Sequence, residues 1–246
     1  MRYAATVLVA LMLVFAGCNT GGGGGTPAAN QTNPSVEASA VPGVNGTQLT
    51  NVSAIATPTF EALSGNAELN VSFDSDSESG QLRYLNDTEQ QLYEISGSQG
   101  AGEVYYVDGE QAAVRNATTG EIRYSSTTNN IGSQAAFSLL FAAVSISQIE
   151  YLHWEAAGTT TIDGETHYVF EADSVNETAL NQPGVTFSPD NVTAVNGRLV
   201  VGTDGVAHEG SISIETDETI TTSFSLDTSG DVEVTAPSWY DESQAS

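Results

Sequence analysis

The stretch ELNVSFDSDSESGQLRYLNDTEQQLYEIS, residues 68–96, shows the pattern that decides the fold. In its first segment Leu69, Val71 and Phe73 alternate with polar residues, and successive side chains of a β-strand point to opposite faces. Two more short segments of this kind follow, each separated from the last by polar turn residues. The stretch therefore predicts neighbouring antiparallel strands with one face toward solvent.

The same rhythm continues almost to the C-terminus. Three Asp-Gly pairs, at residues 108–109, 163–164 and 204–205, supply the positive φ angles that tight hairpins need. We expect strands at residues 68–75, 80–85, 91–96, 103–107, 111–115, 121–125, 149–157, 159–162, 166–172, 192–201, 207–216, 219–227 and 232–235.

One segment, residues 131–147, breaks this rhythm. Phe137, Leu140, Phe141 and Val144 recur there at helical spacing, and the segment contains no charged residue. A helix over residues 135–147 would be apolar around most of its circumference, so it should lie deep against the sheet. Weaker helices are expected at residues 52–63 and 174–181. The fold class is therefore mainly β (α+β).

The charge of the chain is extreme. Its 246 residues include 31 acidic and five basic residues, all five arginine, for a net charge of −26. Such a charge opposes compaction in ordinary buffer, but at 1 M salt the Debye length falls to about 3 Å and the repulsion is screened. The composition resembles that of halophilic archaeal proteins; an acidic secreted protein from a non-halophile is the alternative. Nucleic acid is excluded as a partner, because no basic residues cluster.

The N-terminus resembles an export signal. Arg2 precedes an apolar segment at residues 4–15, which is too short to span a bilayer comfortably. The sequence Phe-Ala-Gly-Cys at residues 15–18 then resembles a lipobox, in which the thiol of Cys18, the only cysteine, accepts a lipid. We expect a signal peptide over residues 1–17 and a lipid anchor on the extracellular face of the cytoplasmic membrane. An uncleaved signal anchor with an idle cysteine is the alternative.

Domain boundaries follow from composition. Residues 18–50 hold the lipidated N-terminus and a linker rich in Gly, Thr, Pro, Ala, Asn and Ser, which cannot bury enough apolar surface to order itself. A single β-rich domain is expected over residues 51–242, with a tail at residues 243–246.

Acceptor tripeptides for N-glycosylation, Asn-x-Ser/Thr, are more frequent than chance predicts. In the strand at residues 68–75, Asn70 lies on the face assigned to solvent. We therefore expect N-glycans on an outward-facing domain. The eight candidates are Asn30, Asn45, Asn51, Asn70, Asn86, Asn116, Asn176 and Asn191.

Consecutive antiparallel strands, one very apolar helix and an N-terminal lipid resemble the LolA/LppX-type lipoprotein fold. The sequence is also similar to halophilic archaeal surface lipoproteins of uncharacterised function, in its lipobox, in GTTTIDGETHYVFEA at residues 158–172 and in PSWYDE at residues 237–242. The resemblance implies a curved antiparallel sheet or incomplete barrel around one central apolar helix and one or two minor helices. It also implies an apolar cavity, which competes with a solidly packed core built of the same residues. The expected lining is Tyr84, Tyr93, Tyr105, Phe137, Leu140, Phe141, Val144, Trp154 and Tyr168.

Catalytic and metal-binding patterns are not found in the sequence. His153, His167 and His208 are the only histidines, and they do not have the spacing of a metal motif. The chain also has neither a Gly-x-Ser-x-Gly elbow nor a lysine to complete a phosphate loop. We expect no enzyme, no metal and no cofactor. Three functions stay open: a carrier of a lipid or other apolar ligand, a glycosylated structural or adhesive module of the cell envelope, and a substrate-capturing lipoprotein for a transporter.

Overall fold

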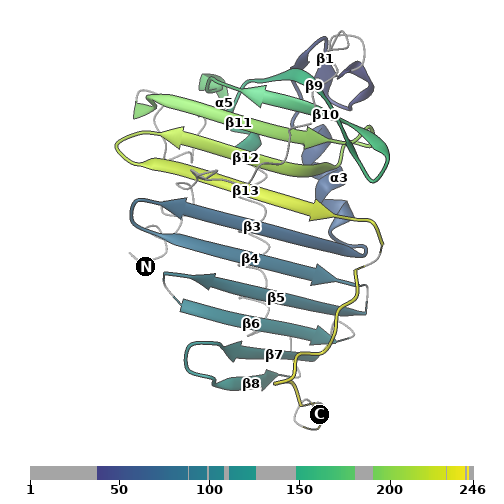
Figure 1. The fold of residues 1–246 in the computed structure, drawn as a ribbon, viewed down its shortest axis with the longest axis vertical. Helices are drawn as coiled ribbons and strands as arrows, with labels where there is room; N and C mark the ends of the chain where they lie inside the picture. Colours follow the sequence, from purple (N-terminus) through teal and green to yellow (C-terminus); the bar gives the residue numbers. More distant parts are fainter. Residues whose placement is uncertain are drawn as a thin grey trace, which may run out of the picture.

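The computed structural model describes residues 38–87, 89–98, 100–107, 111–125, 148–180, 191–230, 232–241 and 243. Within these ranges thirteen strands form one antiparallel sheet (Figure 1). The strands are β1 (Val44–Asn45), β2 (Gln48–Leu49), β3 (Ala67–Ser75), β4 (Ser79–Asn86), β5 (Gln90–Gly97), β6 (Gly100–Val107), β7 (Gln111–Asn116), β8 (Ile122–Ser125), β9 (Trp154–Ile162), β10 (Glu165–Ala172), β11 (Ala194–Val201), β12 (Ala207–Glu215) and β13 (Thr219–Asp227). The helices are η1 (Ala38–Ala40), α3 (Ser53–Ala62), η2 (Gln148–Tyr151) and α5 (Glu177–Leu180).

The sheet consists of two meanders that lie side by side. The strand order is β1-β2-β9-β10-β11-β12-β13-β3-β4-β5-β6-β7-β8, so that the last strand of one meander, β13, pairs with the first strand of the other, β3. Leu69 and Val71 of β3 stand opposite Leu226 and Phe224 of β13 in this pairing. The ends of the order, β1 and β8, do not meet, and the sheet stays open. The predicted mainly β fold with a curved antiparallel sheet is confirmed.

Most predicted elements are found within one or two residues of their expected bounds. The Asp-Gly pair at residues 163–164 turns the β9–β10 hairpin with φ of 51° and 84°, and Gly205 turns β11 into β12 with φ of 87°. The pair at residues 108–109 and the helix expected at residues 135–147 lie outside the described residues.

Three expectations need correction. Residues 149–157 do not form a strand throughout, because η2 precedes β9, which then runs unbroken from Trp154 to Ile162. Residues 232–235 are not a strand. The predicted linker is also too long at its C-terminal end, because residues 38–50 belong to the fold: β2 pairs with β9, and the side chains of Ala38 and Val41 are buried.

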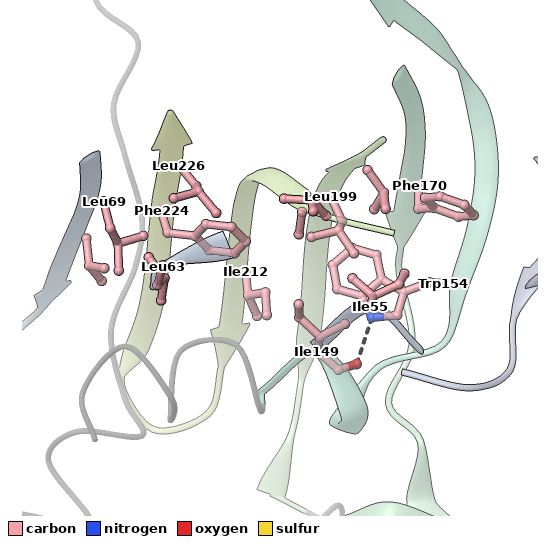
Figure 2. Packing of buried hydrophobic residues seen from close by; sticks show 14 of the residues in the cluster. Ile55, Leu63, Leu69, Ile149, Trp154, Phe170, Leu199, Ile212, Phe224 and Leu226 are labelled. Carbon is pink, nitrogen blue, oxygen red and sulfur yellow. Dashed lines mark hydrogen bonds between the residues drawn. The ribbon is translucent and has the colours of Figure 1, made fainter. Parts of the chain in front are cut away.

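The main apolar core lies on one face of the sheet, which we call the inner face. Helix α3 packs there, with Ile55 and Leu63 among the buried side chains of β3, β12 and β13 (Figure 2). The hydroxyl of Thr59, 0% exposed, fixes the helix to the sheet. It donates a hydrogen bond to the Ile55 carbonyl at 2.7 Å and accepts one from the Ala207 amide at 3.0 Å.

Two phenylalanines of the inner face lie over glycines of the neighbouring strand. Phe73 stands opposite Gly80, and Phe224 stands opposite Gly210. A Cβ atom at either glycine would overlap the facing ring. The missing side chain is therefore the reason that each ring can lie flat on the sheet.

A second, smaller core lies on the opposite face, which we call the outer face. Residues 232–241, the C-terminal segment, cross the ends of β4–β8 there (Figure 1). Tyr240 packs edge-on against Tyr105 with ring centroids 4.7 Å apart, and Val234 lies beside Leu85 and Leu92. Hydrogen bonds fix both ends of the segment: the Val234 amide donates to the Asp87 carboxylate at 3.0 Å, and the Asp241 amide donates to the Tyr124 hydroxyl at 3.0 Å.

Candidate functional site

The candidate site is the inner face of β3–β7, on the side of α3 away from β9. One register row of the sheet runs from Leu69 through Tyr84, Tyr93 and Val104 to Val114. All five side chains point to the inner face because they are direct cross-strand partners. The row is a continuous strip of aliphatic and aromatic side chains across five strands, and all but Val114 are buried.

Three tyrosines, which we call the tyrosine cluster, lie on this strip or beside it: Tyr84, Tyr93 and Tyr106. The ring centroids of Tyr84 and Tyr93 are 4.7 Å apart and tilted by 36°, and those of Tyr93 and Tyr106 are 5.9 Å apart with an edge-on contact. The Tyr84 hydroxyl donates to the Leu63 carbonyl at 3.2 Å, and the Tyr93 hydroxyl donates to the Gln91 side-chain oxygen at 3.4 Å. Helix α3 thus ends at one border of the cluster.

Burial decides the protonation of these phenols. Loss of solvent raises the pKa of Tyr84 to about 12, and the same cause raises the pKa of Tyr93 and of Tyr106. All three hydroxyls therefore stay protonated and neutral at physiological pH. A buried group of apolar rings with neutral hydroxyl tips matches an apolar or weakly polar molecule better than an ion.

The structure places two other predicted lining residues on the inner face but beyond α3. Trp154 is 1% exposed and donates its indole N–H to the Ile149 carbonyl at 2.8 Å, beside Ile55 and Leu199 (Figure 2). Tyr168 of β10 is 8% exposed and belongs to the same core cluster. These residues form the part of the core under α3 and η2, and the tyrosine cluster belongs to the same buried core on the other side of α3.

Tyr105 lies on the outer face of the sheet, so its predicted place in the inner-face lining is wrong. It belongs to the second core, where it contacts Tyr240 and donates a hydrogen bond to the Gln90 side-chain oxygen. Its neighbour Tyr106 occupies the inner-face position that was predicted for Tyr105. Four apolar residues follow each other at 104–107, so alternation alone did not separate the two faces. The other predicted lining residues, Phe137, Leu140, Phe141 and Val144, lie outside the described residues.

The glycan acceptors differ in their availability. Asn45, Asn51, Asn70, Asn116 and Asn191 are exposed, and Asn176 is half-buried. Asn86 is 2% exposed, and its amide nitrogen donates to the carbonyls of Leu63 and Gly65 at 3.1 and 2.7 Å. The folded chain therefore offers no room for a glycan at Asn86, and we remove it from the candidates. Asn30 lies outside the described residues, as does Cys18.

Two observations concern metals and membranes. Among the described residues, no group of three or more His, Cys, Asp or Glu side chains is placed to hold a metal ion. In the same part of the chain, none of the helices has the length and apolar character needed to span a membrane.

Comparison with known proteins matches the chain to one family and finds distant similarity to several solved structures. Residues 3–243 match the model of a family of unknown function, DUF7537. A search of curated proteins finds no significant match. Among solved structures, LprF from Mycobacterium bovis is 12% identical, with 80% of this chain and 100% of that chain covered and a TM-score of 0.41.

Two further solved structures show the same distant similarity. The lipoprotein LppX of Mycobacterium tuberculosis is 13% identical over 71% of this chain and 93% of its own, with a TM-score of 0.33. A LolA superfamily protein from Nitrosomonas europaea is 12% identical over 70% of this chain and 93% of its own, with a TM-score of 0.21.

Proposed function

The chain belongs to DUF7537, a family of unknown function, and we propose that it is a non-catalytic envelope lipoprotein that holds an apolar ligand on the inner face of its sheet. The observation that carries the proposal is the tyrosine cluster. Tyr84, Tyr93 and Tyr106 place tilted and edge-on rings with neutral hydroxyls in the buried core beside aliphatic side chains of β3–β7. A ligand held among these side chains would meet apolar rings and neutral hydroxyls, which suit the chain and the weakly polar end of a lipid.

The sequence supports a lipid anchor and an extracellular location for this protein. The lipobox-like residues 15–18 would place a lipid on Cys18 and the domain on the extracellular face of the cytoplasmic membrane. The exposed acceptor asparagines support the same outward placement through N-glycans. The acidic surface supports a saline environment, because only high ionic strength removes the self-repulsion of a net charge of −26.

A second candidate is a glycosylated structural or adhesive module without any ligand. One observation favours it: the polar tips of the inner face find partners within the chain, as Trp154 does at Ile149 and Tyr84 does at Leu63. A face in which polar groups are satisfied internally needs no ligand to complete it.

The experiment that separates the two candidates is extraction of the chain from its native membrane, followed by native mass spectrometry and by solvent extraction of bound lipid. The carrier predicts a lipid bound near one to one, in addition to the anchor. We pair this measurement with Ile95→Trp, which enlarges a half-buried inner-face side chain of β5, and with Ser96→Trp, which places the same ring on the outer face of that strand.

The two variants give opposite expectations. Ile95→Trp should lower the amount of bound lipid, because the indole occupies inner-face space, whereas Ser96→Trp should leave the amount unchanged. Wild-type protein that is folded and carries its anchor but no second lipid would refute the carrier and support the envelope module. Equal loss of lipid in both variants would also refute the assigned face.

A further inference from the structure

The outer face of β13, β3, β4, β5 and β6 is hollowed into a groove of about 580 Å³. Its floor is made of uncharged polar side chains on direct cross-strand partners, such as Ser223, Ser72 and Gln81. Ser72 and Ser223 are hydrogen-bonded to each other at 3.1 Å. The groove exists because the side chains of Ser72 and Ser223 are small, while the longer side chains of Arg83 and Glu94 lie beside them.

Asn70 is the acceptor asparagine that lines this groove. Its side chain is exposed in the middle of β3, and Ser72 completes its Asn-x-Ser tripeptide in the same groove. The other exposed acceptors, such as Asn45 and Asn191, do not line it. A sugar attached to Asn70 would therefore start inside the groove.

The side-chain amide of Asn70 is held in a fixed position. Its Nδ2 donates to Glu68 Oε1 at 3.1 Å, and the same oxygen accepts a hydrogen bond from Arg83 Nε at 2.9 Å. Arg83 also bonds Glu94 through Nη1 at 3.2 Å, and its hydrogen bond to Glu68 lowers the pKa of that carboxyl. N-glycosylation replaces one of the two Nδ2 hydrogens, so the remaining N–H can keep its bond to Glu68 while the sugar extends away from it.

We propose that a glycan on Asn70 lies in the outer-face groove and covers the centre of the sheet, including Arg83. The groove offers hydroxyl, amide and carboxylate groups from Ser72, Gln81, Ser96 and Glu94, and these are partners for the hydroxyls of a sugar. A covalently attached glycan needs no high intrinsic affinity, because its effective concentration beside the groove is high.

The glycan gives the outer face a protection that charge cannot give in salt. The floor of the groove is flat and uncharged, and salt weakens repulsion between carboxylates on two approaching copies. A bulky, hydrated sugar keeps the sheets of two protein copies apart at any ionic strength. The proposal rests on the outward location given above, but it is independent of a ligand on the inner face.

The test uses the full chain, expressed in a host that N-glycosylates exported proteins, and treated with an arginine-selective dicarbonyl reagent. Arg198 is the control for Arg83, because their side chains are 45% and 44% exposed. Arg83 is ion-paired with Glu68 and Glu94 at 2.9 and 3.2 Å, and Arg198 is ion-paired with Glu209 at 3.0 Å. Arg198 does not line the groove, so its modification reports general effects. Peptide mass spectrometry gives both the occupancy of Asn70 and the rate of modification at each arginine.

We compare the wild type with Ser72→Ala, which removes the acceptor tripeptide but keeps Asn70, and with Ser72→Thr, which keeps the tripeptide. In the wild type and in Ser72→Thr, Asn70 should carry sugar and Arg83 should react several-fold more slowly than in Ser72→Ala. The rate at Arg198 should be the same in all three proteins.

Two results would overturn the proposal. If another acceptor is glycosylated but Asn70 is not, the glycan at Asn70 is excluded and the outward location still stands. If none of the acceptors is glycosylated, the result argues against the Asn70 glycan and against the outward location. Equal reactivity of Arg83 with and without sugar on Asn70 would show that the glycan points away from the groove.

Discussion

Replacement of Thr59 by valine should weaken the attachment of α3 to the sheet. Thr59 is fully buried, and its hydroxyl is the acceptor for the Ala207 amide at 3.0 Å. Valine has nearly the same shape and a similar helix propensity, so the main change is the loss of the oxygen. The Ala207 N–H then loses its acceptor in a buried site, because Ala207 is also 0% exposed.

The magnitude follows from that one unpaired group. A buried donor left without a partner costs about 1–3 kcal/mol. The lost bond from Thr59 to the Ile55 carbonyl adds little, because a helical carbonyl keeps its backbone partner. For a domain of this size about 1 kcal/mol corresponds to roughly 2–4 °C in Tm, so we expect Tm to fall by about 2–12 °C.

The assay is thermal unfolding followed by circular dichroism, together with hydrogen exchange at the Ala207 amide. Thr59→Ser is the matched control: it keeps the oxygen and removes only the methyl group, so it should preserve the slow exchange of Ala207. If Thr59→Val were as stable as the wild type, or if the serine variant were the less stable of the two, the hydrogen bond would not be the attachment that we describe.

Four further predictions follow from single features of the chain. Gly80→Ala should destabilise the fold by about 1–3 kcal/mol, because the new Cβ would overlap the Phe73 ring. Gly102→Ala is the control, because its Cβ would meet only the Arg115 carbonyl oxygen at an ordinary 3.5 Å, and denaturant unfolding compares the stability of the two variants. Burial lowers the pKa of His208, and so does the neighbouring His167, whose ring meets it edge-on with centroids 4.6 Å apart. The unfolded chain therefore binds the proton more readily. The free energy of unfolding should therefore fall as the pH drops below about 6.5, and His208→Gln should flatten this slope; an unchanged slope would contradict the assignment. Cys18→Ser should release the protein from the membrane fraction, which immunoblotting of fractions checks, and retention would favour an uncleaved signal anchor. Dialysis to about 0.1 M salt should reduce β structure by circular dichroism because repulsion is no longer screened, and an unchanged spectrum would refute the halophilic interpretation.

The sequence by itself determined most of the strands, the β9–β10 and β11–β12 turns and the class of the fold. Alternation in β3 and the Asp-Gly turn at residues 163–164 are local features, readable from a few neighbouring residues. The exposure of Asn70 follows from the same alternation, because Leu69 and Val71 must face the core. These features did not need knowledge of what packs against the sheet.

Only the tertiary structure decided which segment covers each face. Tyr105 and Tyr106 are equivalent in the sequence, and they separate because the C-terminal segment covers the outer face while the inner face belongs to the core. Asn86 reads as an exposed acceptor, yet it is buried because the carbonyls after α3 reach its amide. The β1–β2 hairpin is too short to predict and forms because β9 offers it an edge. Burial is set by contacts between residues far apart in the chain, and a local pattern does not contain them.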